Sequence, residues 1–153
     1  TKLRDYKETI LNSGYSAHEI LTLASIVELE GVNDESRNGV ASVFYNRLKS
    51  GWTLGSDVTT YYAFKTDFSQ ELTLDQYNTC NPYNTRSSCF SGLPVGPICS
   101  SGLESIKAVV KPVTSDYYYF VADKNKKTYY AKTSAEFNQI INELKKNNLW
   151  YTY

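Results

Sequence analysis

Residues 16–31 read SAHEILTLASIVELEG, and this stretch predicts the central helix of the fold. Ser16 and Glu19 have the spacing of a capping box, so we expect the helix to begin at Ala17. Apolar residues at positions 20, 21, 23, 24, 26, 27 and 29 leave no polar face, which is typical of a buried helix. Gly31 predicts that the helix ends after Glu30, in the manner usual for a glycine at a helix C-terminus.

Further helices and one hairpin are predicted along the rest of the chain. A second helix is expected over 34–49, ended by Ser50 and Gly51, with an apolar face formed by Val40, Val43, Phe44 and Leu48. A short element is expected over 57–64, and a capping box at 73–76 predicts another short helix. Ser101 and Glu104 should cap a helix that ends near Val110, because Pro112 prevents its extension.

The C-terminal part of the sequence completes the expected fold class. Strands over 116–122 and 128–132 should form a hairpin across DKNKK, and a last helix is expected over 133–147. Helices combined with one small antiparallel hairpin predict an α+β fold. The length of 153 residues predicts a single domain over 1–153.

The charge balance and hydropathy exclude several function classes. The 16 Lys and Arg residues equal the 16 Asp and Glu residues, so the basic excess of a nucleic-acid binder is missing. No apolar run reaches the roughly 18 residues of a membrane span, and no signal peptide is visible. The polar opening TKLRDYKE is not typical of a natural start, and we expect it to follow an upstream segment.

The cysteines and the single histidine predict neither a metal site nor a cofactor. Cys80, Cys89 and Cys99 have no histidine at metal-ligand spacing. Cys80 and Cys89 flank the polar loop NPYNTRSS and can pair in an oxidising compartment. Cys99 would then be a free thiol, expected to be a small buried residue because no partner base is apparent.

Two carboxylates at the end of the buried helix are the candidates for chemistry. Glu28 and Glu30 stand two residues apart and project about 200° apart, so they cannot face one cleft as a pair. Glu30 is better placed, because the free carbonyls at the helix end should raise its pKa toward that of a general acid. The other carboxylate could pair with Arg37 or Arg47. The alternative for Glu30 is an ordinary helix-end salt bridge.

A series of motifs favours the interpretation of Glu30 as a catalytic residue. The strings LTLASIVELE, VASVFYNRL, LGSDVT, PYNTR, GLPVGPI and LESIKA occur in this order. Together they resemble the YceG-like family of endolytic murein transglycosylases over roughly residues 21–131. The resemblance implies an α+β catalytic domain that cleaves the MurNAc–GlcNAc bond within peptidoglycan strands and leaves 1,6-anhydro-MurNAc ends. It implies that Glu30 is the catalytic residue and that Glu28 supports it.

The implied reaction explains why one carboxylate suffices. Most glycoside hydrolases use two carboxylates, one as the acid and one to activate water or attack carbon. Here the 6-hydroxyl of the sugar is a tethered nucleophile of high effective concentration. Glu30 would protonate the leaving oxygen and then take the proton of the 6-hydroxyl.

Other motif residues are expected to shape a substrate cleft. Some of these residues also have a purely structural interpretation. Arg47 could form a buried ion pair, Asp57 could cap a helix, and the 83–85 segment could form an Asx-type turn. GLPVGPI is expected to form a rigid wall, because proline fixes the backbone. The expected substrate-binding residues are Glu28, Asn46, Arg47, Asp57, Tyr83, Asn84, Thr85, Leu93, Pro94 and Gly96.

Three positions depart from the pattern of the family. Val58 stands where the family often has proline, Val95 where a second proline is usual, and Arg86 where tyrosine is usual. The SSCFS stretch also reads as a small insertion. These departures leave Glu30 untouched and put the shape of the neighbouring loops in doubt.

The resemblance also implies a cellular setting. Full-length members carry a membrane anchor and an upstream LysM-like region, so we expect a soluble part of an anchored protein on the extracytoplasmic face of the bacterial membrane. The implied partners are peptidoglycan strands, together with peptidoglycan synthases and divisome or elongasome proteins. The alternatives are a non-catalytic peptidoglycan-binding scaffold and a muramidase that uses water.

Overall fold

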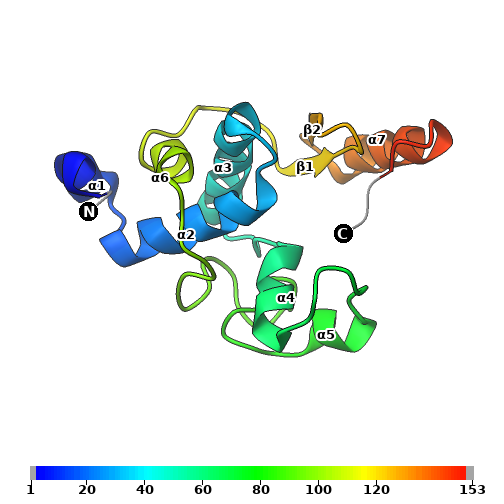
Figure 1. The fold of residues 1–153 in the computed structure, drawn as a ribbon, viewed down its shortest axis with the longest axis horizontal. Helices are drawn as coiled ribbons and strands as arrows, with labels where there is room; N and C mark the ends of the chain where they lie inside the picture. The colour runs from blue at the N-terminus through cyan, green and yellow to red at the C-terminus, as the bar shows by residue number, and fades with distance from the viewer. Residues whose placement is uncertain (1–2, 151–153) are drawn as a thin grey trace.

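The fold of the described residues combines helices with one small sheet (Figure 1). The computed structural model describes residues 3–150, so positions 1–2 and 151–153 of the expected domain lie outside the described residues. Within 3–150 there are seven α-helices, one short 3-10 helix and a two-stranded antiparallel sheet. The α+β prediction is therefore confirmed.

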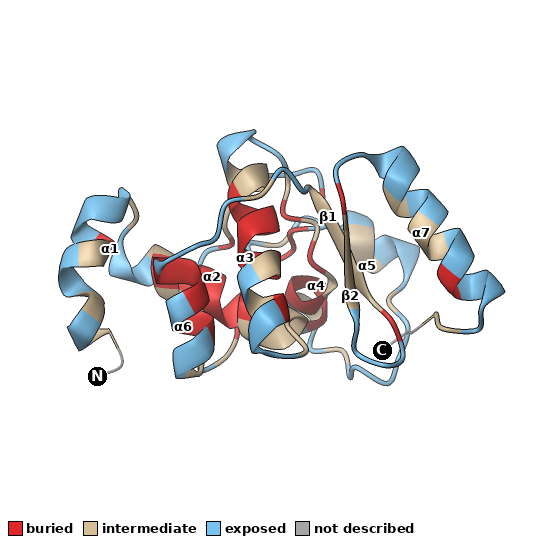
Figure 2. Cartoon of the chain, turned by 90° about the horizontal axis from the view of Figure 1, so that it is seen from above, coloured by how far each residue is buried: buried red, intermediate tan, exposed pale blue. Residues whose placement is uncertain are grey.

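Helix α2 (Ala17–Glu30) is the centre of the core. Its capping box is present as expected: Glu19 N–H donates to the Ser16 hydroxyl, and the Glu19 side chain accepts from Ser16 N–H. Ile20 and the run 22–27 are buried, which confirms the interpretation of its apolar surface (Figure 2). It packs against α3 (Asp34–Lys49) and α6 (Leu103–Val110). Near the N-terminus, α1 (Lys7–Ser13) lies beside α6, and the short η1 (Arg4–Tyr6) contacts α1.

The C-terminal glycine of α2 acts differently from the expectation. Gly31 has an extended backbone with φ −75° and ψ 133°, and not the left-handed conformation of a usual glycine cap. A Cβ atom at Gly31 would lie 2.4 Å from Cγ of Arg37. Glycine is thus needed here for the close passage of the chain beside α3.

Helix α3 joins the core to the hairpin. Strands β1 (Tyr119–Ala122) and β2 (Thr128–Ala131) pair antiparallel, and α7 (Ser134–Lys146) packs on them. The hairpin meets α3 through an edge-to-face contact of Phe44 and Phe120, with ring centroids 5.6 Å apart. Gly39 of α3 lies under the Tyr130 ring, and a Cβ atom there would be 1.9 Å from the Tyr130 hydroxyl.

The first strand is shorter than the expected 116–122. The backbone before Tyr119 is bound to α3: Asn46 Nδ2 donates to the carbonyls of Ser115 and Tyr117, each at 2.8 Å. Arg47 Nε donates to the carbonyl of Tyr118 at 2.7 Å. Side chains of α3 therefore take the acceptors that a longer strand would offer to its partner.

Helices α4 (Asp57–Phe64) and α5 (Leu74–Asn78) form a separate layer below α2 (Figure 1). The capping box expected at Thr73 and Gln76 is present at the start of α5. Residues 80–101 then run from α5 to α6 without a helix or strand, apart from one isolated bridge between Thr53 and Gly92.

The capping box expected at Ser101 and Glu104 is wrong. The N-cap of α6 is Gly102, and its N–H donates to Glu28 Oε1 at 3.3 Å. The Ser105 hydroxyl donates to Oε2 of the same carboxylate. Helix α6 is therefore capped by a side chain of α2, which leaves no need for a local cap.

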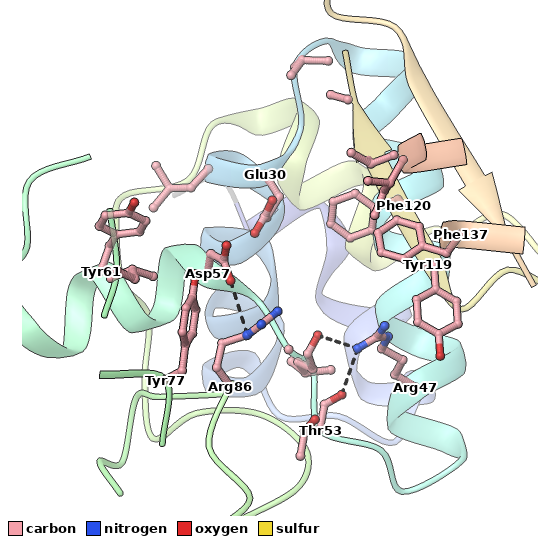
Figure 3. Close-up of a pocket in the computed structure, with 18 of the residues that line it drawn as sticks. Glu30, Arg47, Thr53, Asp57, Tyr61, Tyr77, Arg86, Tyr119, Phe120 and Phe137 are labelled. Carbon is pink, nitrogen blue, oxygen red and sulfur yellow. Dashed lines mark hydrogen bonds and ion pairs between the residues drawn. The ribbon is translucent and has the colours of Figure 1, made fainter. Parts of the chain in front are cut away.

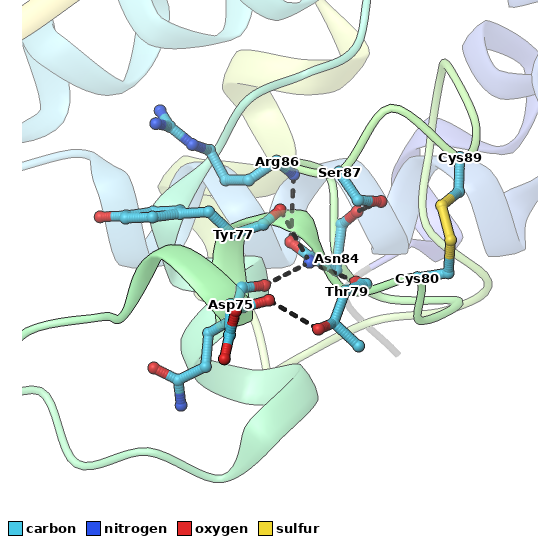
Figure 4. The surroundings of a disulfide bond; sticks show 9 residues. Asp75, Tyr77, Thr79, Cys80, Asn84, Arg86, Ser87 and Cys89 are labelled. Carbon is cyan, nitrogen blue, oxygen red and sulfur yellow. Dashed lines mark hydrogen bonds between the residues drawn. A yellow bond between two sulfur atoms is a disulfide. The ribbon is translucent and has the colours of Figure 1, made fainter.

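A disulfide joins Cys80 and Cys89 in the long loop (Figure 4). Inside the loop, Asn84 Nδ2 donates to the carbonyls of Gln76 and Thr79, each at 2.8 Å. Residues 80–89 of this loop are thus closed covalently at their ends and held by hydrogen bonds of Asn84 in their middle. Cys99 is a free, half-buried thiol.

Candidate active-site cleft

A cleft of about 840 Å³ opens beside the C-terminal end of α2 (Figure 3). One wall comes from the 53–57 segment with α4 and α5, and the other from the hairpin and α7. Its polar and aromatic lining includes Glu30, Arg47, Thr53, Asp57, Tyr61, Glu71, Tyr77, Arg86, Tyr119, Phe120, Phe137 and Trp150.

Glu30 is the last residue of α2 and lies half-buried in the wall of this cleft. Its Oε1 accepts a hydrogen bond of 2.7 Å from the Ser56 hydroxyl. Ser56 is 2% exposed and directly precedes α4. The Glu30 carboxylate is therefore hydrogen-bonded to a buried hydroxyl at the start of α4.

A buried group of hydroxyls holds Ser56 in place. The Ser56 N–H donates to Thr85 Oγ1 at 2.9 Å, and Thr59 Oγ1 donates to the Ser56 carbonyl at 2.7 Å. Thr59 Oγ1 and Thr85 Oγ1 are themselves hydrogen-bonded at 2.7 Å. Thr59 and Thr85 are completely buried, so water does not compete for these hydrogen bonds. The group therefore keeps Ser56 in one position.

Asp57, the first residue of α4, places a second carboxylate in the same cleft. Its Oδ1 is buried and accepts no hydrogen bond, and its charge partner is Arg86 Nε at 3.4 Å. Burial raises the pKa of the Asp57 carboxyl, and the Arg86 guanidinium opposes this effect. Arg86 also lies over the Tyr77 ring, 4.7 Å from its centroid.

Arg47 lines the cleft from α3 but does not pair with a carboxylate there. It donates instead to three carbonyls: those of Tyr118 at 2.7 Å, Leu54 at 3.1 Å and Thr53 at 3.3 Å. Burial lowers the pKa of its guanidinium. Arg47 thus joins the 53–54 segment to the start of the hairpin, and so connects the two walls.

Glu28 lies apart from Glu30, as the two-residue spacing requires. Its carboxylate accepts from Gly102 and Ser105 of α6, and Arg37 Nε is 3.6 Å from Oε2. It does not line the cleft. This carboxylate joins α2 to α3 and α6, and its expected contact with substrate stays a prediction.

Most of the other expected substrate-binding residues serve the fold. Asn46 is used on the 115–117 backbone, and both Asn84 and Thr85 are completely buried with internal hydrogen bonds. Pro94 and Gly96 are buried, and Leu93 packs on the core. None of these residues lines the cleft, and their contact with substrate stays a prediction. Their polar groups already have partners inside the protein.

The GLPVGPI segment packs against the start of α2. His18 Nε2 is hydrogen-bonded to the Val95 carbonyl at 2.9 Å, and Gly96 lies against the His18 and Tyr83 side chains. Tyr83 and Val95 line a second, mainly apolar pocket on the other side of α4. The segment forms a wall there, away from Glu30.

Sequence reasoning missed several residues of the cleft. Ser56, which lies behind the cleft lining and binds Glu30, carried a signal, because it stands beside Asp57 in LGSDVT. Arg86 was visible as a departure from the family pattern. Other missed residues, which only the tertiary packing brings to the cleft, include Tyr61, Tyr77, Tyr119, Phe120 and Phe137.

Two further features bear on the class of protein. Among residues 3–150, no group of three or more Asp, Glu, His or Cys side chains is arranged to hold a metal ion. Within the same range, every helix is too short or too polar to cross a membrane.

Comparisons with known proteins agree on one family. Residues 1–143 match the model of the YceG-like family. The chain is 37% identical over 134 residues to an endolytic murein transglycosylase of Bacillus subtilis, covering 88% of the chain and 36% of that protein. It is 34% identical over 147 residues to an endolytic murein transglycosylase of Streptococcus pneumoniae, covering 92% of the chain and 26% of that protein.

A solved structure shows the same fold. A crystal structure of a YceG-like protein from Listeria monocytogenes superposes with a TM-score of 0.83 at 37% identity, covering 90% of the chain and 44% of that protein. The chain thus spans between about a quarter and just under half of the length of these relatives.

Proposed function

The chain belongs to the YceG-like family, and from this premise we propose that it is the catalytic part of an endolytic peptidoglycan lytic transglycosylase. One observation carries the proposal. Glu30 projects into a cleft and its carboxylate is held by a buried serine hydroxyl. A positioned carboxylate in a cleft lined by aromatic rings fits acid catalysis on a glycan.

The reaction uses Glu30 twice. As the acid, it donates a proton to the glycosidic oxygen while the bond from the MurNAc C1 to that oxygen breaks. As the base, it takes the proton of the 6-hydroxyl while O6 bonds to C1 and closes the 1,6-anhydro ring. The carboxyl ends in its starting protonation state, and no water is consumed.

The Ser56 hydroxyl supports this cycle. Its hydrogen bond to Oε1 fixes the orientation of the Glu30 carboxyl group. The protonated and ionised forms alternate during the reaction, and a hydroxyl can adapt to both because it can donate or accept. The buried threonines behind Ser56 keep it in place throughout.

The aromatic lining fits a sugar strand. Tyr77 and Tyr119 lie on the two walls of the cleft, and rings of this kind pack against the C–H faces of pyranoses (Figure 3). Asp57 adds a buried carboxylate oxygen with no hydrogen bond. In the transglycosylase reaction, this oxygen accepts from a sugar hydroxyl.

Asp57 also favours a second candidate function, hydrolysis by a muramidase. Hydrolases use a second carboxylate to activate water or to stabilise the reacting carbon. Asp57 is such a carboxylate in the same cleft as Glu30. In this case water would attack C1, and the product would carry a reducing end.

The proposal is tested by digestion of purified peptidoglycan strands with the wild-type protein and with Glu30→Gln. We expect the wild type to release fragments with anhydro ends and the variant, folded to the same extent, to release none. Mass spectrometry separates the candidates, because an anhydro product is lighter by one water than a reducing-end product. Cleavage by Glu30→Gln would overturn the role of Glu30, and a wild type that binds strands without cutting them would favour a scaffold.

The setting follows from the same proposal. The substrate is a cell-wall polymer, so the site of action is outside the bacterial membrane, on a protein held there by an anchor. Peptidoglycan synthases are the partners expected at that place. The Cys80–Cys89 disulfide supports such a location, because disulfides persist in oxidising compartments.

A further inference from the structure

An aromatic platform, formed by Trp52 and Tyr118, lies at the edge of the cleft. The two rings have centroids 4.9 Å apart at an angle of 42°, and the Tyr119 ring meets Trp52 at 6.1 Å. Trp52 nevertheless keeps 40% of its surface exposed. The Trp52 ring therefore offers open aromatic surface next to the residues that line the cleft.

The platform is held rigidly. Trp52 N–H donates to the Arg47 carbonyl at 3.0 Å, and the Trp52 carbonyl accepts from Gly92 N–H at 3.4 Å. The Tyr118 hydroxyl is hydrogen-bonded to Ser50 Oγ at 2.8 Å. The Trp52 backbone and the Tyr118 ring are therefore anchored before any ligand arrives, which lowers the entropic cost of binding.

The platform is continuous with the cleft. The guanidinium carbon of Arg47 lies 5.6 Å from the centroid of the Trp52 ring and 5.1 Å from that of Tyr119. Arg47, Tyr119 and Thr53, the residue that follows Trp52, all line the cleft. Trp52 itself does not line it, so the platform extends the same surface outward.

We propose that the Trp52 platform binds a sugar ring of the glycan strand just outside the cleft. This inference rests on the proposed function and adds a subsite to it. A strand that is cut within its length must leave the cleft, and Arg47 and Tyr119 connect the cleft lining to the open Trp52 ring. The C–H face of a pyranose packs on an indole, whereas a peptide or lipid would need polar partners or a larger apolar area that the platform lacks.

The experiment measures binding of glycan oligomers of increasing length to Glu30→Gln protein by calorimetry. Trp52→Ala in this background removes the platform, and Trp52→Phe keeps a smaller ring. The matched control is Tyr62→Ala, because Tyr62 is 44% exposed and also contacts one aromatic neighbour, Tyr83, at 4.8 Å. Tyr62 lines the second pocket and not the cleft.

We expect Trp52→Ala to weaken the binding of long oligomers by about three- to tenfold, the range of one aromatic contact. Oligomers short enough to fit within the cleft should bind to within about twofold of the parent. Trp52→Phe should bind long oligomers with an affinity between those of the parent and Trp52→Ala. Tyr62→Ala should change the affinity for neither short nor long oligomers. Thermal unfolding of each variant checks that the fold is retained.

Two outcomes overturn the inference. Equal loss for short and long oligomers would mean that Trp52 acts on the cleft through the fold, and no loss with long oligomers would mean that the platform carries no sugar. Both leave the proposed function standing, provided that the wild type cuts strands. If neither parent nor wild type binds or cuts any glycan, the proposed function and the subsite fail together.

Discussion

The hydroxyl of Ser56 donates to Oε1 of Glu30 at 2.7 Å instead of capping the helix that it begins. Ser56 is the N-cap of α4, and its side chain accepts no hydrogen bond from the N–H groups of that helix. A serine cap usually contributes about 1 kcal/mol to stability. The Ser56 hydroxyl makes no such contribution to α4, because it is hydrogen-bonded to the Glu30 carboxylate of α2.

Ser56→Ala should therefore reduce turnover more than stability. We expect kcat to fall by about tenfold, because one hydrogen bond of roughly 1.4 kcal/mol to the reacting carboxylate is lost. The unfolding free energy should change by less than about 1 kcal/mol, since no cap is removed. Steady-state kinetics and chemical denaturation measure the two effects, with exposed Ser100→Ala as the control. An unchanged kcat would show that the Ser56 contact plays no part in catalysis.

Glu28→Ala should act on stability. Its carboxylate accepts from Gly102 and Ser105 at the start of α6, and both donors lose their partner. We expect a loss of about 1–3 kcal/mol in the unfolding free energy. Glu28→Gln should recover much of this loss, because the amide oxygen still accepts. Full stability of Glu28→Gln combined with complete loss of turnover would instead assign a chemical role to Glu28.

Asp57→Asn should make the protein more stable at neutral pH. Burial holds the pKa of Asp57 above its unfolded value of 3.8, so the folded state binds this proton more tightly. The unfolding free energy contributed by Asp57 therefore falls as pH rises from about 3.8 through the folded pKa. The gain of Asp57→Asn should be largest above this window and vanish below it, as thermal melts at several pH values would record. A destabilised variant at pH 7 would show that the pair with Arg86 outweighs burial.

The same variant separates the two candidate reactions. A muramidase needs the Asp57 carboxylate, so Asp57→Asn should lower kcat by a factor of about 100 or more if it acts as a catalytic base. A transglycosylase uses Asp57 only to bind, and the change should then appear in KM. The readout is the kinetics of strand cleavage together with the mass of the product ends.

Reduction of the disulfide should destabilise the long loop. Cys80 and Cys89 are nine residues apart, and closing a loop of this size stabilises a protein by about 2–3 kcal/mol. We expect Cys80→Ser with Cys89→Ser to lower the unfolding free energy by this amount, and a reductant to do the same in wild type. Cys99→Ser is the control because Cys99 is a free thiol. Equal stability with and without reductant would contradict the prediction.

The sequence predicted the helices well where local signals and burial agree. The capping boxes at Ser16 and Thr73 and the apolar surface of α2 are local features, and each is present in the structure. The cap of α6 was mispredicted, because its acceptor comes from Glu28, more than 70 residues away. The early start predicted for β1 has the same cause, because side chains of α3 bind the carbonyls of Ser115 and Tyr118, which precede the strand.

The cleft was harder to predict than the fold. Polar residues of the motifs, such as Asn84 and Thr85, were expected to face substrate, but they are buried behind the cleft and hold its walls. Tyr77 and Tyr119 reach the cleft only because α5 and the hairpin face each other across it. Sequence patterns carry the identity of such residues but not the direction in which they project.

Gly39 has a consequence that reaches beyond its own helix. The absence of a side chain at this position lets the Tyr130 ring lie directly on α3, and Tyr130 is paired with Phe120 in the hairpin. Phe120 and its neighbour Tyr119 form the wall that faces Glu30. The width of the cleft therefore depends in part on a glycine that is not itself among the residues lining the cleft.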